Sequence, residues 1–294
     1  MYYRRKVLLA ILEKFGGRLS KTDLQKYLFL FSQKQSNPAY DFYPYRFGCY
    51  SAQATQDLGT LKKYELVQET PLGWELSKSD HFFTTLKAAD RKDLVSFHQE
   101  FRMLTGKDLI RYVYTHYPFY AIHSEIAKDI LSINELANVD KEKPKSNTRA
   151  IFTIGYEGKS IEKYVTELIR NSVHVLCDVR KNPLSMKYGF SKKQLKGVVE
   201  SVGIQYIHFP GLGIVSSKRQ ELNSKSDYQK LFLEYQKTTL RENQSDLRSL
   251  NKIYEENARI ALTCFEADSE CCHRSHTANA LLDAIKEPTS VIHL

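Results

Sequence analysis

Apolar residues in the first 80 positions recur mainly at helical spacing. This spacing predicts helices at 7–15, 20–31 and 50–64. An aromatic-rich loop is expected at 40–49, and two short runs at 66–69 and 73–76 flank a turn and predict a β-hairpin. Three helices followed by a hairpin is the order of a winged helix, in which the third helix can enter a major groove. Residues 90–137 add further helical pattern.

Beyond residue 149 short apolar runs alternate with segments in which apolar residues recur at helical spacing. The runs predict strands at 151–154, 173–177, 205–209, 258–265 and 290–294. The segments between these runs predict helices at 160–170, 194–201, 228–240, 245–257 and 277–286. Such alternation implies a mostly parallel sheet flanked by helices. We therefore expect a C-terminal α/β fold, preceded by an α-rich winged-helix domain.

A polar stretch at 139–149 separates the two patterns. It contains Pro144 and has no apolar periodicity, as expected of a solvated linker. The predicted organisation is a winged-helix-like nucleic-acid-binding domain at 1–80, a helical extension at 81–138, the linker, and an α/β domain with a ligand or active site at 150–294.

The composition is that of an ordinary globular protein, with 42% hydrophobic and 26% charged residues among 294. No apolar run approaches the roughly 18 residues of a membrane-spanning helix. The apolar run at 7–12 stops at Glu13 without a signal-peptide cleavage site, so we expect a cytoplasmic protein with no membrane partner. The five cysteines have no framework spacing and are expected to be free thiols.

Basic residues cluster in two stretches of a chain with net charge +9. Residues 1–50 carry nine basic and three acidic side chains, and residues 180–196 carry six basic and none acidic. Clustered positive charge favours phosphate contacts, although a generally basic solvated surface is the simpler alternative. The candidate nucleic-acid contacts are Arg46, Tyr50, Ser51, Gln53, Lys62, Lys63, Lys187, Lys192, Lys193 and Lys196.

Polar residues and glycines directly follow the predicted strands. Because ligands of parallel sheets bind beyond the carboxyl ends of the strands, we expect these residues to converge on one site. In chain order they are Tyr156, Glu157 and Gly158, then Asp178 and Arg180, then Gly211 and Gly213, and finally Glu266, Cys272, His273 and Arg274.

Carboxylates are the candidate catalytic groups of this site. Asp178 and Glu266, with Glu157 as a third acid, suit general acid/base work on a glycosidic or N-glycosidic bond, and a hydrolytic metal site would need similar residues. Arg180 and Arg274 suit a bidentate grip on phosphate, or else ion pairs with the two acids. The remaining ligand-binding candidates are Tyr156, Gly158, Gly211, Gly213, Cys272 and His273.

The cysteines and histidines at 264–276 are not predicted to bind a metal. Structural zinc sites usually bring two separated ligand pairs, whereas here the ligands crowd one stretch and Cys264 lies inside an apolar strand. Cys272 beside His273 suggests a thiolate nucleophile as an alternative to helix capping and packing. We predict neither a metal nor a cofactor.

Two parts of the chain resemble known families. Segments 24–29, 43–51 and 58–61 resemble winged-helix modules of bacterial and archaeal regulatory and defence proteins, which contact DNA or other proteins. Segments 153–158, 178–180 and 203–206, with Glu266 and 272–274, resemble the domain of unknown function 488 family over about 150–285. This second resemblance implies the fold and offers no established reaction.

We therefore expect a DNA-binding protein with a nucleic-acid- or nucleotide-directed enzymatic domain. The favoured reaction is hydrolysis of the N-glycosidic bond of a modified base, in DNA processing or phage defence. A nuclease fits the same residues, as does a non-catalytic sensor of a nucleotide or modified base that regulates through DNA. Homodimerisation is open at this stage.

Overall fold

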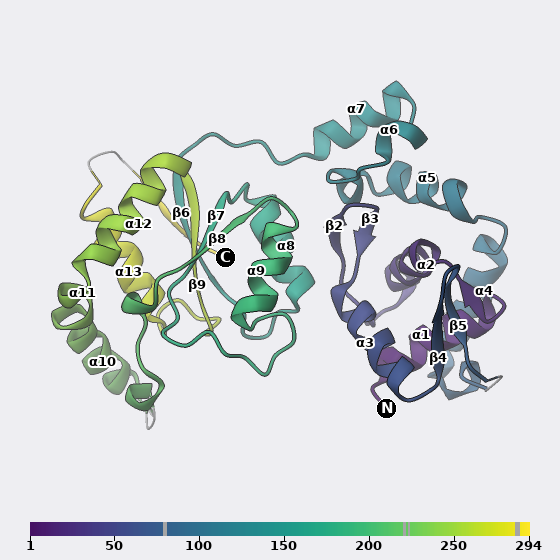
Figure 1. Ribbon diagram of the computed structural model, residues 1–294, viewed down its shortest axis with the longest axis horizontal. Coiled ribbons are helices and arrows are strands. Elements are labelled where there is room, and N and C mark those ends of the chain that lie inside the picture. Colours follow the sequence, from purple (N-terminus) through teal and green to yellow (C-terminus); the bar gives the residue numbers. More distant parts are fainter. Residues whose placement is uncertain (79–80, 220–221, 223, 286–288) are drawn as a thin grey trace. The chain divides into compact units, whose positions relative to one another are not determined.

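The computed structural model describes residues 1–78, 81–219, 222, 224–285 and 289–294 (Figure 1). The chain divides into an N-terminal unit, Met1–Lys143, and a C-terminal unit, Pro144–Leu294. Each unit is described by itself.

The N-terminal unit is rich in helices. Its α2 and α3 begin where predicted because the hydroxyls of Ser20 and Ser51 accept hydrogen bonds from the main-chain N–H groups of Asp23 and Ala54. Its first eight elements are α1 (Tyr3–Lys14), β1 (Arg18–Leu19), α2 (Lys21–Lys34), β2 (Tyr43–Tyr45), β3 (Gly48–Tyr50), α3 (Ala52–Lys63), β4 (Val67–Thr70) and β5 (Gly73–Leu76).

Strands β1, β5 and β4 form an antiparallel sheet, in which Trp74 of β5 pairs with Leu19 and Glu69 and is buried. The segment 40–49 is not simply a loop, because it contributes to the hairpin β2–β3, where Tyr43 pairs with Tyr50. The predicted order of three helices and a terminal hairpin is present. Its interpretation as a winged helix stays a prediction.

The rest of the N-terminal unit is helical. It comprises η1 (Phe83–Thr85), α4 (Ala88–Phe101), α5 (Gly106–His116), η2 (Pro118–Ala121), α6 (Ala127–Ile130) and α7 (Ile133–Glu142). Helix α7 occupies the first residues of the predicted linker at 139–149, because Val139 is buried and extends the helix. The predicted boundary at residue 80 lies outside the described residues.

The C-terminal unit is an α/β domain, which confirms the predicted fold class. Its elements are β6 (Ala150–Gly155), α8 (Ile161–Arg170), β7 (Val175–Asp178), α9 (Lys192–Glu200), β8 (Gln205–His208), η3 (Pro210–Leu212), η4 (Ser216–Arg219), α10 (Lys225–Lys237), α11 (Thr239–Glu242), α12 (Gln244–Asn257), β9 (Arg259–Cys264), α13 (His273–Leu282) and β10 (Val291–His293).

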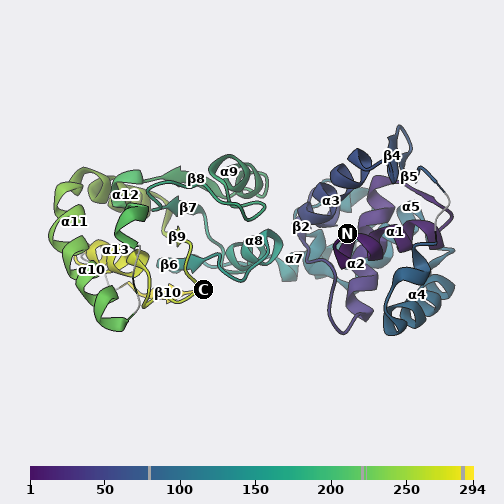
Figure 2. The same cartoon turned by 90° about the horizontal axis from the view of Figure 1, so that it is seen from below.

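The five strands form one sheet in the order β10-β6-β9-β7-β8, and every pair is parallel. Helices α8 and α9 cover one face, and α10, α12 and α13 cover the other (Figure 2). Strands β6, β7 and β9 are buried along their whole length, as expected of central strands between two helical layers. Helix α13 begins at His273 and not at Thr277, and residue 286 of the predicted helix lies outside the described residues.

Candidate functional site at the strand ends

Strands β6, β9, β7 and β8 end in register at one edge of the sheet. Gly155 of β6 pairs with Cys264 of β9, and Asp178 of β7 pairs with Thr263 of β9 and His208 of β8. The segments that follow these strands are joined by main-chain hydrogen bonds, since the N–H groups of both Tyr156 and Glu157 donate to the Phe265 carbonyl. The sheet therefore brings the predicted strand-end residues together.

Asp178 is engaged entirely within the protein. Its side chain is 0% exposed and receives both Nε and Nη2 of Arg180, at 2.8 and 2.6 Å, together with the Tyr206 hydroxyl at 2.6 Å. Its burial and these bonds favour the ion-pair alternative. A catalytic role for Asp178 stays a prediction.

Arg180 is likewise a structural residue. Its Nη1 donates to the Tyr156 hydroxyl at 3.2 Å and to the Phe190 carbonyl at 2.9 Å. Burial opposes the guanidinium charge, but the hydrogen bonds and attraction to Asp178 outweigh it and raise the pKa of Arg180. Its donors hold the chain that follows β7, which favours the ion-pair alternative, and the phosphate grip by Arg180 stays a prediction.

Tyr156 covers the sheet edge and does not present its ring to a ligand. It is buried, stacks on Phe190 with ring centroids 4.4 Å apart, and meets Phe265 edge to face at 5.2 Å. Its main-chain carbonyl accepts a hydrogen bond from Lys187 Nζ at 2.8 Å. These contacts fix residues 180–196, the basic segment, across the ends of β6 and β7.

The basic segment also reaches β8. His208 Nε2 lies 2.8 Å from the Arg180 carbonyl and donates to it, so Nδ1 is an acceptor for Lys192 Nζ at 2.9 Å. Lys181 and Lys193 are exposed, and Lys196 lies 3.8 Å from Glu200. Burial lowers the pKa of Lys187, although nearby Glu157 partly opposes this.

Two predicted phosphate-binding glycines serve close packing. A Cβ atom on Gly213 would lie 2.0 Å from the Lys181 nitrogen, and one on Gly211 would lie 2.2 Å from an Asp246 side-chain oxygen. The third, Gly158, is exposed and has φ +73°, and a Cβ atom there would have nothing within 4 Å. Of these three glycines, Gly158 therefore keeps open space for a ligand.

Glu266 is the half-buried carboxylate of this edge. Its loop is held by Arg274, which is 0% exposed and donates to the main-chain carbonyls of Glu266 and Ala267. Glu157 is exposed and accepts a hydrogen bond from the Ala267 N–H group at 3.0 Å. Arg274 thus positions the loop, and its role at a phosphate stays a prediction. Glu266 and Glu157 lie at the solvent boundary.

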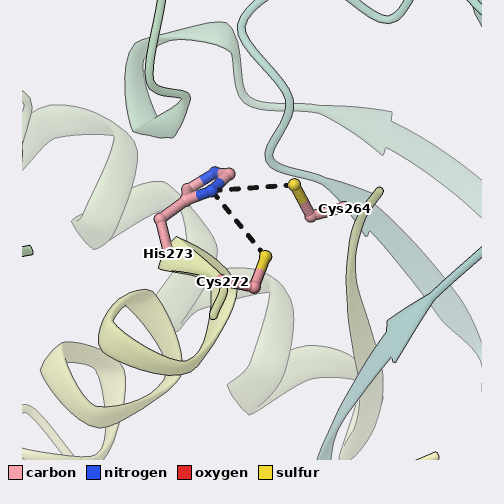
Figure 3. A group of neighbouring side chains, drawn as sticks. All are labelled: Cys264, Cys272 and His273. Carbon is pink, nitrogen blue, oxygen red and sulfur yellow. Dashed lines mark hydrogen bonds between the residues drawn. The ribbon is translucent and has the colours of Figure 1, made fainter. Parts of the chain in front are cut away.

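Cys264, Cys272 and His273 form a buried cluster (Figure 3). One ligand atom from each lies within 4.8 Å of the others, which makes them the metal-capable group in the part of the chain that the structure describes. The Cys264 thiol donates to Glu266 Oε2 at 3.2 Å. Burial raises the pKa of the Cys272 thiol, which argues against the alternative of a thiolate nucleophile. Their sequence spacing did not favour a metal site, because these residues crowd one stretch without a second separated ligand pair.

A groove of about 440 Å³ lies between α10 and α13 and includes part of the loop that follows Glu266. Aromatic side chains of Tyr228, Phe232 and His276 line it together with Asp268 and Glu270. Sequence reasoning did not select these residues, because the two helices contribute them from distant positions. Their chemistry suits a flat polar molecule such as a nucleobase.

The nucleic-acid candidates of the N-terminal unit differ in availability. Ser51 is buried and caps α3, whereas Lys63 is exposed and Tyr50 and Gln53 are half-buried. Lys62 bonds Glu69 at 3.1 Å, and Arg46 lies 3.6 Å from Glu125. Exposed ion pairs of this kind are weak and can be exchanged for phosphate contacts. The DNA contacts of Lys62 and Arg46 therefore stay predictions. Ser51 has a structural role as the cap of α3.

Residues 160–281 match the family model described as "Domain of unknown function DUF488". The match lies within the C-terminal unit and runs from the start of α8 into α13. The chain has no match among curated proteins or solved structures. Within the described residues, no helix combines the length and apolar character needed to cross a membrane.

Proposed function

Since residues 160–281 of this chain form a domain of the DUF488 family, we propose that the protein binds nucleic acid and acts on a nucleotide at the strand-end edge of this domain. The observation that carries the proposal is the position of the basic segment. It contains six basic and no acidic residues, and Lys187 and Lys192 attach it to the ends of β6 and β8. DNA is the favoured partner.

The exposed surface of the basic segment suits a polyanion. Lys181 and Lys193 face solvent, and Leu184 and Met186 are 85% and 104% exposed. Lysines contact phosphates independently of sequence, while exposed apolar side chains can contact bases that are unstacked. This combination favours a nucleic acid with an accessible base over a small anion.

Glu266 is the proposed catalytic residue. Asp178 is buried, so the candidate catalytic carboxylates from the sequence that lie at the solvent boundary are Glu266 and Glu157. A single carboxylate can activate water for hydrolysis of an N-glycosidic bond, whereas a nuclease usually gathers three or more acids. We therefore propose release of a modified base, from the strand or from a nucleotide, as the reaction.

Replacing Glu266 by Gln is expected to lower base release from modified DNA at least about 100-fold, because general acid/base catalysis is lost. Release is measured by chromatography of the free base, and DNA affinity by fluorescence anisotropy, which should not change. Glu256→Gln, which changes an exposed carboxylate on α12, is the control.

An unchanged rate for Glu266→Gln contradicts the catalytic role. If the wild-type protein binds DNA but produces neither free base nor metal-dependent cuts, the non-catalytic sensor is the correct function.

Replacing Lys181 and Lys193 together by Ala is expected to weaken DNA binding. The slope of log K against log salt concentration should fall by about 1 per lysine, because the binding reaction releases fewer counterions when phosphate contacts are lost. Anisotropy titrations at several salt concentrations measure both quantities. Lys252→Ala on α12, which removes an exposed lysine 3.8 Å from Glu256, is the control. Equal effects of the two variants would show that binding follows net charge and not the basic segment.

A further inference from the structure

We propose that Cys264, Cys272 and His273 form a binding site for a zinc-class metal ion. The His273 Nδ1 atom lies 3.6 Å from Cys264 Sγ and 3.9 Å from Cys272 Sγ (Figure 3). Around a tetrahedral zinc ion with its usual bond lengths, sulfur and nitrogen ligands are about 3.5 Å apart. The three side chains therefore have nearly the spacing that the ion requires before any ion is added.

The histidine ring is oriented for metal binding. Its Nε2 atom lies 2.9 Å from the Val179 carbonyl, which can only accept a hydrogen bond, so Nε2 carries the proton. In the neutral ring, Nδ1 then presents its lone pair to the two sulfurs. A histidine held through its second nitrogen by a carbonyl is the usual support of a zinc ligand.

The end of one strand and the start of one helix supply the three ligands. Cys264 is the last residue of β9, Cys272 precedes α13, and His273 is its first residue. These residues are 2%, 0% and 1% exposed. Their side chains would therefore shield a bound ion from bulk water. Two thiolates and an imidazole are soft and borderline donors that favour zinc over magnesium or calcium.

Three protein ligands leave one position of a tetrahedral ion open. Glu266 contacts the cluster, with Oε2 3.2 Å from Cys264 Sγ. It is not part of the group whose ligand atoms all lie within 4.8 Å of one another. The three-residue site is therefore expected to bind its ion without Glu266, and the inference is independent of the proposed function.

Two other arrangements would explain the same cluster. In one, the thiols simply donate hydrogen bonds to Glu266 and His273 and no ion binds. In the other, Cys264 and Cys272 lose two electrons and two protons to an external oxidant and form a disulfide. Each predicts a different content of metal and free thiol in the purified protein.

The test is made on the full chain, purified under reducing conditions and dialysed against zinc. Elemental analysis is expected to find one zinc per chain, and Co²⁺ in place of zinc is expected to give a thiolate-to-cobalt absorption band that zinc abolishes. Folded wild-type protein with no bound zinc and no cobalt band overturns the proposal, as does a Cys264–Cys272 disulfide under these conditions.

Variants then locate the site. Cys264→Ser and Cys272→Ser are expected to lower the zinc content at least tenfold, whereas Cys271→Ser and Glu266→Gln are expected to retain it. If a buried variant fails to fold, the cobalt spectrum of the wild-type protein still decides the result. Because no substrate is used, absence of base release would not affect this outcome.

Discussion

Replacing Asp178 by Asn is expected to lower the free energy of unfolding of the C-terminal unit by about 3–5 kcal/mol, because the buried guanidinium of Arg180 loses its counter-charge. Both side chains are buried, with the closest N–O contact at 2.6 Å. Urea unfolding followed by circular dichroism measures the change. Glu200→Gln, which removes an exposed carboxylate 3.8 Å from Lys196, should cost less than about 1 kcal/mol.

The double variant Asp178→Asn/Arg180→Met separates charge burial from packing. It removes the uncompensated charge, so it should recover part of the stability lost in Asp178→Asn. A cost below about 1 kcal/mol for Asp178→Asn alone would mean that the pair is open to water, and Asp178 would again be a candidate for chemistry.

Replacing Gly155 by Ala is expected to destabilise the C-terminal unit by about 1–3 kcal/mol and to displace the loop that carries Glu266. A Cβ atom at position 155 would lie 1.8 Å from the Glu266 carbonyl oxygen, and this neighbour is main chain that has little freedom to move. Thermal unfolding measures stability, and base release measures the displacement of Glu266.

Gly197→Ala is the matched control. Gly197 lies within α9 and a Cβ atom there has nothing within 4 Å, so alanine should stabilise this helix by roughly 0.5–1 kcal/mol. Wild-type stability and activity in Gly155→Ala would show that the close approach of β6 to the Glu266 loop is not required.

Hydrophobic periodicity was sufficient to predict the parallel sheet and the convergence of its strand ends. It did not reveal which polar residues face solvent, because Asp178 and Arg180 look the same in sequence whether they pair or bind a ligand. Their pairing is supported by Tyr206 of strand β8 and by the main-chain carbonyl of Phe190, which lies ten residues further along the basic segment. Similarly, Gly211 and Gly213 resemble ligand-binding turns until the chain that packs against them is known.

The metal-capable cluster was considered from the sequence and set aside for a specific reason. The cysteines and histidines at 264–276 crowd one stretch without a second separated ligand pair, and Cys264 lies inside an apolar strand. In the structure Cys264 ends its strand and His273 begins α13, which brings the two side chains together.

The buried position of Trp74 in β5 has a practical consequence for all of these measurements. It is the single tryptophan of the sequence and lies in the N-terminal unit, so tryptophan emission monitors unfolding of that unit. Circular dichroism records both units. A change in circular dichroism without a change in tryptophan emission therefore reports unfolding of the C-terminal unit, and no added dye is needed.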